Sequence, residues 1–125
     1  MPYTTTWNNE GVYWKLTGVV TEEEVEQANG EMYGDGRFDS LKYSIWDTSN
    51  VERFDMSLED IDISAETDFS TTRYVNNFKV ALISNNAHTQ DFCQRYIDIS
   101  QALKSPWEFE IFNQLKVARG WVKSQ

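Results

Sequence analysis

The chain has 125 residues, a formal net charge of −9, 40% apolar residues and 14% aromatic residues. The length suits a single domain, and the apolar fraction is that of a globular protein, which excludes the disordered and fibrous classes. An acidic surface repels phosphate groups, so neither nucleic acid nor an anionic membrane is an expected partner.

The first 36 residues predict a β-hairpin followed by a helix. Strands are expected at 3–7 and 12–20, on either side of a turn-forming segment that ends in Gly11. Thr21 and Glu24 have the spacing of a capping box, so a helix should begin here. We expect this helix to bury one face and to end at a glycine: the face is Val25, Ala28 and Met32, and the glycine is Gly34 or Gly36.

The middle of the chain predicts a strand, a connection and a second helix. Residues 41–46 are apolar enough for a central strand, whereas residues 47–56 are mostly polar and predict a connection with Val51 and Phe54 packed inward. Ser57 precedes acidic residues that suit a first helical turn, so it should cap a helix. The predicted inward face of that helix is Leu58, Ile61, Ala65 and Phe69.

The last third of the chain predicts a buried strand at 78–84, a helix that starts at 85–86, a strand at 107–112 and a final helix capped by Asn113. The complete order is ββαβαβαβα, which predicts one α/β domain over residues 1–125 with a mixed, mostly parallel sheet. The inward residues of the two helices are expected to be Phe92, Tyr96, Ile99 and Leu103, and then Leu115, Ala118 and Val122.

No group of residues predicts catalysis, a metal or a cofactor. His88 and Cys93 lie five positions apart on one predicted helix, about 140° apart around its axis, so they cannot form a reactive pair. We expect Cys93 to be a small core residue and His88 an exposed polar residue. The acidic clusters fall at predicted helix starts, where the helix dipole accounts for them, and the glycines at 30–36 follow a helix instead of a strand. The chain is therefore not expected to be an enzyme.

Two stretches of the chain resemble STAS domains. Residues 14–21 (Trp-Lys-Leu-Thr-Gly-Val-Val-Thr) resemble the early strand of that family, which runs through a glycine into a capped helix. Residues 44–47 and 50–58 resemble its central signature, in which a strand ends at an Asp and an Asp-x-Ser-Gly later opens a helix. The order of elements also matches. The chain looks closer still to the divergent SpoIIAA-like branch, which is grouped by fold with CRAL-TRIO-type lipid carriers.

This resemblance implies a non-enzymatic regulatory domain that binds a protein partner, such as a kinase or an anti-sigma-like protein, at residues 47–60. Ser57 stands at the position of the family's phosphorylated serine, and it is either a phosphorylation site or only a helix cap. Leu58 stands where the family has a glycine, and a larger side chain at that point could obstruct a kinase or a partner surface. The residues expected to form the partner surface are Asp47, Asn50, Asp55 and Leu58.

A second reading makes the domain a carrier or sensor of a small hydrophobic or lipid-like ligand. Its apolar pocket would be lined by Trp46, Phe54, Phe69, Phe78 and Phe109, although aromatic residues at these spacings also suit a packed core. The surplus of Trp residues leaves a homodimer open. The start of the chain lacks the features of a signal peptide and no apolar run is long enough to span a membrane, so we expect a cytoplasmic protein without stable membrane insertion.

Overall fold

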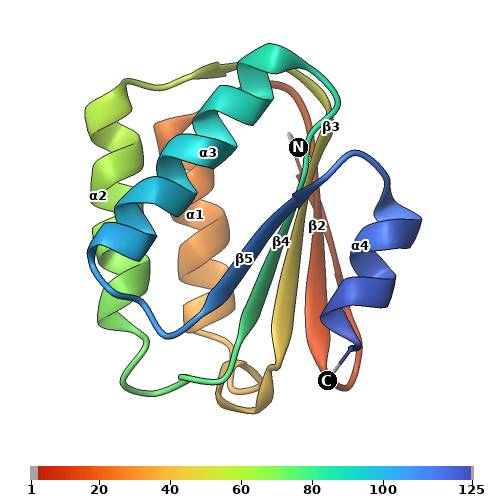
Figure 1. Cartoon of the computed structure of the whole chain (residues 1–125), viewed down its shortest axis with the longest axis vertical. Helices are drawn as coiled ribbons and strands as arrows, with labels where there is room; N and C mark the ends of the chain where they lie inside the picture. The colour runs from red at the N-terminus through yellow and green to blue at the C-terminus, as the bar shows by residue number, and fades with distance from the viewer. Residues whose placement is uncertain (1–2, 125) are drawn as a thin grey trace.

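Five strands lie side by side in one sheet, in the order β1-β2-β3-β4-β5, in a computed structural model that describes residues 3–124 (Figure 1). The predicted order ββαβαβαβα is confirmed. Helices α1, α2 and α3 cover one face of the sheet and α4 covers the other (Figure 1). The strands are β1 (Tyr3–Trp7), β2 (Gly11–Thr21), β3 (Tyr43–Asp55), β4 (Lys79–Ile83) and β5 (Glu108–Phe112), and the helices are α1 (Glu22–Tyr33), α2 (Leu58–Ser70), α3 (Ala87–Ala102) and α4 (Leu115–Val122).

The sheet is mixed and mostly parallel, as predicted. β1 runs antiparallel to β2, whereas β2, β3, β4 and β5 are parallel to one another. In the hairpin between β1 and β2, Oδ1 of Asn8 accepts hydrogen bonds from the backbone N–H groups of Glu10 and Gly11, both at 2.9 Å. Glycine is required at position 11, because a Cβ there would lie 2.1 Å from the ring of Tyr43.

The two faces of the sheet bury separate apolar cores. Under α1, α2 and α3, Trp14 is fully buried and stacks on Trp46 with 5.1 Å between ring centroids. Under α4, Ile45 and Ile83 pack against Ala118. Because successive residues of a strand point to opposite faces, the apolar strands β3 and β4 supply both cores. The indole Nε1 of Trp14 is buried without a hydrogen-bond partner.

Three helices begin with a side-chain cap. Thr21 and Glu24 form the predicted capping box before α1, and Ser57 forms a second one with Asp60 before α2. The Asn86 side chain caps α3. The prediction that Asn113 caps α4 was wrong: the N-cap is the next residue, Gln114, and its side chain makes no capping bond.

Strand β3 is much longer than predicted, and the prediction of a connection at residues 47–56 was wrong. The strand continues to Asp55 and stays paired with β2 as far as Thr21, whereas its pairing with β4 stops at Asp47. The polar residues that suggested a loop are satisfied inside the sheet. The hydroxyl of Thr48, for example, donates to the carbonyl oxygen of Ile83 at 2.6 Å.

Two predicted helix faces are displaced in the structure. The buried face of α2 is Ile61, Ala65 and Asp68, and it leaves Leu58 outside with an exposed fraction of 56%, so Leu58 was wrongly expected to face inward. The fully buried residues of α3 are Thr89, Cys93, Ile97 and Ser100, while the predicted inward residues, Phe92, Tyr96, Ile99 and Leu103, are half-buried. Small Thr and Ser residues therefore occupy part of the buried face of α3, and the rings of Phe92 and Tyr96 line the space between the sheet and the helices.

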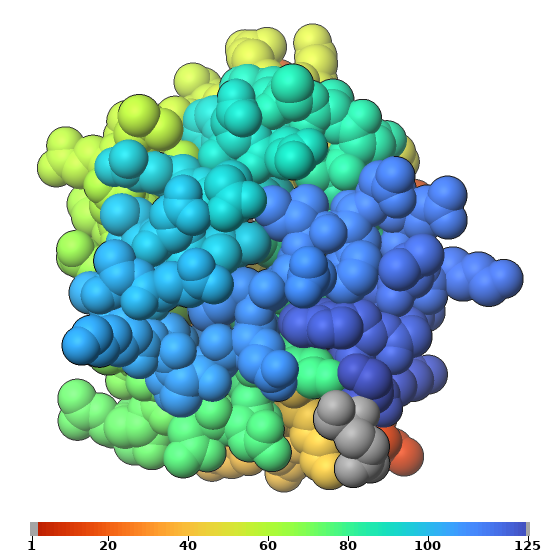
Figure 2. Space-filling view, in the orientation of Figure 1, coloured from red at the N-terminus to blue at the C-terminus, as the bar shows by residue number. Residues whose placement is uncertain are grey.

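The far edge of the sheet is open. β5 is visible between α3 and α4 (Figure 2). Its residues are exposed or half-buried, and none of them is fully buried. Glu108 and Glu110 are exposed along it. Separately, none of the described helices combines the length and the hydrophobicity that crossing a lipid bilayer requires.

Candidate functional site

The end of β3 leads directly into the start of α2, and this junction carries the serine singled out by the sequence. Ser57 is exposed, and its Oγ accepts a hydrogen bond from the backbone N–H of Asp60 at 3.1 Å. In return, Oδ2 of Asp60 accepts from the backbone N–H of Ser57 at 3.0 Å. The hydroxyl is therefore held at the N-terminus of the helix, where free N–H groups and the dipole favour negative charge.

The residues expected to form the partner surface do not all meet. Asp55 and Leu58 flank Ser57 and are exposed, so these three residues form what we call the α2 start surface. Asn50 is exposed as well, but it lies further back on β3, opposite Thr17 of β2.

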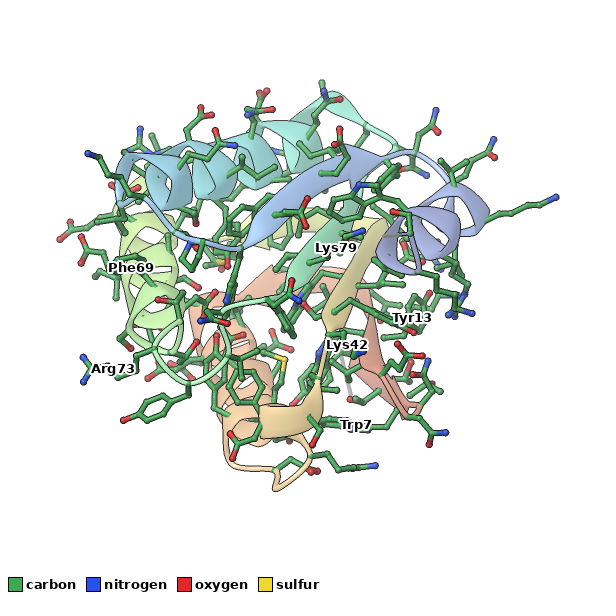
Figure 3. All side chains as sticks on the ribbon, turned by 60° about the horizontal axis from the view of Figure 1, so that its bottom comes forward. Trp7, Tyr13, Lys42, Phe69, Arg73 and Lys79 are labelled. Atoms are coloured by element: carbon green, nitrogen blue, oxygen red, sulfur yellow. The ribbon has the colours of Figure 1, made fainter. Side chains whose placement is uncertain are left out.

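Asp47 is not part of that surface. It is only 5% exposed and sits on the face of the sheet covered by α4. Its Oδ2 accepts a hydrogen bond from the hydroxyl of Tyr13 at 2.6 Å, and its Oδ1 accepts from the backbone N–H and hydroxyl of Ser49. Figure 3 shows Tyr13 beside α4, where Arg119 lies over its ring at 5.2 Å. Burial and the hydrogen bond to Asp47 raise the pKa of Tyr13. The same hydrogen bond joins β2 to β3 on the face covered by α4.

A cavity of about 110 Å³ lies between the sheet and the helices α1, α2 and α3. Its wall is mostly apolar, and two of the five aromatic residues expected around a pocket, Trp46 and Phe54, belong to it. Phe54 stacks on Phe92 of α3, and its backbone N–H donates to Nε2 of His88 at 3.2 Å. These contacts fix the end of β3 against α3.

The other three aromatic residues lie elsewhere. Phe78 is 2% exposed and packs in the core against Phe38 and Trp107. Phe109 contacts Tyr96 edge-on and lines a polar depression between α3 and β5. Phe69 lies on α2, near the loop that carries Arg73 (Figure 3).

Asp68 is the residue in this region that the sequence analysis missed. It lines the cavity, and it is buried within the apolar face of α2. The hydroxyl of Tyr33 on α1 donates to one carboxylate oxygen, and the hydroxyl of Tyr96 on α3 donates to the other at 2.5 Å. Burial raises the pKa of Asp68 to about 6, against the lowering effect of the two hydrogen bonds. Its position seven residues after Ile61, on the predicted buried face, was the available signal.

A polar contact joins two of the helices that form the cavity wall. Among the described residues, the wall contains no activated nucleophile. Arg95 on α3 donates two hydrogen bonds to Asp62 on α2, at 2.9 and 2.8 Å, and so joins the two helices. Cys93 lines the cavity, and burial raises the pKa of its thiol to about 12, which keeps it protonated. No group of His, Cys, Asp and Glu side chains within residues 3–124 is arranged to hold a metal ion.

Comparison with known proteins identifies the fold. No family model matches the chain, and no curated protein sequence is significantly similar to it. Several solved structures are similar, and three of them match over nearly their whole length. The anti-sigma factor antagonist SpoIIAA in its unphosphorylated form has a TM-score of 0.64 and 12% identity, and the match covers 97% of this chain and 96% of that one.

The second is the Bacillus cell fate determinant SpoIIAA in the phosphorylated form, with a TM-score of 0.61, 13% identity and coverage of 97% and 99%. The third is an uncharacterised protein of the DUF3478 family with a SpoIIAA-like fold, from Shewanella loihica PV-4, with a TM-score of 0.60, 17% identity and coverage of 96% and 91%. The chain therefore has the SpoIIAA-like fold, in agreement with the resemblance found in the sequence.

Proposed function

We propose that this chain is a non-enzymatic regulatory domain that binds a protein partner through the α2 start surface, Asp55, Ser57 and Leu58. The observation that carries the proposal is the exposure of an apolar side chain, Leu58, beside a serine at a helix N-terminus. The SpoIIAA-like fold supports it, because structures with this fold include an anti-sigma factor antagonist and a phosphorylated protein.

The physical contribution of this surface would come from its central leucine and its charged rim. Covering the exposed half of the Leu58 side chain contributes roughly 1 kcal/mol to association. Asp55 and Glu59 are exposed beside it, and they favour a partner with basic residues around an apolar pocket. The capping box holds Ser57 and the first turn of α2 in one conformation, so a partner would meet a preformed surface.

A charge introduced at Leu58 tests this proposal. We expect Leu58→Glu to abolish recovery of a specific partner that is identified by cross-linking and mass spectrometry on the tagged chain in its own host. Val117→Glu is the matched control, since Val117 is 52% exposed, close to the 56% of Leu58, and lies near the start of α4 on the other face of the sheet. The proposal fails if the partner is retained by Leu58→Glu or is lost equally in both variants.

The second candidate function, a carrier or sensor of a small apolar ligand, is favoured by the cavity beneath α1, α2 and α3. Its volume of about 110 Å³ is below that of the engineered cavity of about 150 Å³ that takes up benzene. The cavity therefore limits a ligand group to about one ring at most and is too small for a lipid chain.

A further inference from the structure

Asp68 is a buried acid whose charge no basic side chain balances. Tyr33 and Tyr96 each donate one hydrogen bond to it, but the described residues place no Lys, Arg or His in an ion pair with it. Each carboxylate oxygen can accept more than one hydrogen bond, so acceptor capacity remains on both. An ionised carboxylate in an apolar setting is costly unless a positive charge pairs with it. A positive charge placed beside Asp68 would therefore offset this cost.

Two further polar side chains line the same wall. Asn29 is only 9% exposed and Ser64 is half-buried. Among the described residues, the one fully buried side-chain polar atom without a partner is Nε1 of Trp14, so the polar atoms of Asn29 and Ser64 remain accessible to water. A polar group of a ligand could replace water there.

The cavity adjoins a groove of about 220 Å³ between α1 and α2, and both spaces are lined by Val25, Asn29, Met56 and Ser64. The groove is lined by the carboxylates of Glu22, Glu26 and Asp60. These acids attract a positive ligand towards the opening and repel an anion. The acids around the opening and Asp68 inside the cavity therefore both favour a positively charged ligand.

The remaining wall suits the body of such a ligand. Trp46, Phe54 and Phe92 present aromatic rings to the cavity, and Leu82 adds an aliphatic surface. Aromatic faces bind organic cations as well as apolar groups. With a volume of about 110 Å³, the space fits one aromatic ring or a short alkyl chain.

We propose that this cavity binds a small organic cation, a primary amine with an apolar body of about one ring, whose ammonium group pairs with Asp68. The body would lie against Trp46 and Phe54, and Asn29 would supply a hydrogen bond near the opening. This binding site goes beyond the proposed partner surface and does not depend on it. Small carboxylates and neutral lipids are disfavoured, the first by charge and the second by size.

The test uses three probes that differ only in the charged end: benzylamine, benzyl alcohol and benzoate. Each is titrated into the ¹⁵N-labelled full chain at pH 7.5, and binding is followed by amide chemical shifts. We expect benzylamine to shift the resonances of Asn29, Ser64 and Cys93, and to bind at least tenfold more tightly than benzyl alcohol. Benzoate should not bind. Equal binding of the amine and the alcohol, or tighter binding of benzoate, would overturn the proposal.

Two variants and one control locate the site. Asp68→Asn should weaken benzylamine binding at least tenfold and leave benzyl alcohol unchanged, whereas Asp98→Asn, at an exposed position on α3, should change neither. Ser64→Leu retains Asp68 and fills the opening, so it should block all probes even if Asp68→Asn does not fold. Benzylamine shifts that persist in Ser64→Leu would sink the idea, because they would come from acids on the surface.

The pH dependence gives an independent readout. Benzylamine affinity should fall when the pH is lowered from 7.5 to 5, since protonation of Asp68 removes the partner of the ammonium group. The titratable groups that face Asp68 are the hydroxyls of Tyr33 and Tyr96, whose raised pKa keeps them protonated throughout. The groove acids Glu22, Glu26 and Asp60 are unchanged in Asp68→Asn, so any pH dependence that survives in this variant belongs to them. An affinity that is constant between pH 5 and 7.5 would contradict the proposal.

Discussion

At the scale of single residues, Asp68 makes the stability of the fold depend on pH. Burial raises its pKa from an ordinary 3.8 to about 6, so between these values the folded chain keeps a proton that the unfolded chain releases. The free energy of unfolding should therefore fall as the pH rises from about 4 to 6, by roughly 3 kcal/mol in total. The full cost applies above pH 6 and is absent below pH 4.

Asp68→Asn should remove this contribution. Urea unfolding at pH 4, 5, 6 and 7 should show the variant gaining stability relative to the parent chain as the pH rises, because asparagine does not ionise. Asp98→Asn serves as the control, since Asp98 is exposed on α3. If the difference between Asp68→Asn and the parent is the same at every pH, Asp68 is not the group that titrates.

Ser57 raises the question of whether the hydroxyl is only a cap. A phosphate there would stand beside Asp55, Glu59 and Asp60, and its charge and bulk would hinder a partner. If the serine is a switch, Ser57→Asp should weaken partner capture severalfold while Ser57→Ala preserves it, in a binding assay with the purified partner. If it is only a cap, Ser57→Ala should lower the free energy of unfolding by about 1 kcal/mol, and both variants should bind the partner equally.

Single residues were predicted correctly where their partners lie nearby in the sequence. The capping box at Thr21 and the cap at Ser57 are confirmed, because a cap and its partner lie three positions apart. Asp68 escaped notice because an acid in a segment rich in Ser, Thr and Asp is expected to face water. Its burial depends on Tyr33 and Tyr96, which lie 35 and 28 positions away along the chain. The helical spacing from Ile61 pointed to position 68, but no local pattern shows the two tyrosines that satisfy an acid there.

At the scale of secondary structure, the elements were predictable and their limits were less so. β1 was predicted with its observed ends, but β3 was cut short at Trp46 because its second half is polar. That half is a strand because β2 is long enough to pair with it as far as Thr21. The length of a strand is thus decided by its neighbour, which a pattern within one segment does not show. The consequence for the site is that Asn50 and Asp55 are held on a strand.

The irregular stretch of β2 gives a matched test of backbone conformation. Gly18 has φ of 69°, in a part of β2 where the register with β3 shifts, and it has open space around its Cα. Gly18→Ala should therefore lower the free energy of unfolding by about 1 kcal/mol through strain alone. Gly30, which is helical and also has open space, should give the opposite sign: Gly30→Ala should raise it by about 0.5–1 kcal/mol. Equal effects in urea unfolding would show that φ at Gly18 is not the controlling factor.

At the scale of the whole molecule, the two proposed binding sites lie on different parts of α2. The α2 start surface lies where β3 and α2 join, and the cavity lies behind it under the same helix. Met56, which immediately precedes Ser57, lines both the cavity and the adjoining groove. The overall architecture was predictable because it follows from the order of elements. The sequence did not predict that Trp46, Phe54 and Asp68 line one cavity, because this depends on how three helices pack.

The order of the strands in the sheet is also their order in the chain, and this bears on how the protein is made. Each strand after the first pairs with the one synthesised just before it, so a chain leaving the ribosome could build its sheet without waiting for a distant segment. The exception is α4, which is made last and alone covers Ile45, Ala81 and Ile83. A chain that stops before Leu115 would expose those side chains to water, the kind of surface by which chaperones and proteases recognise an unfinished product.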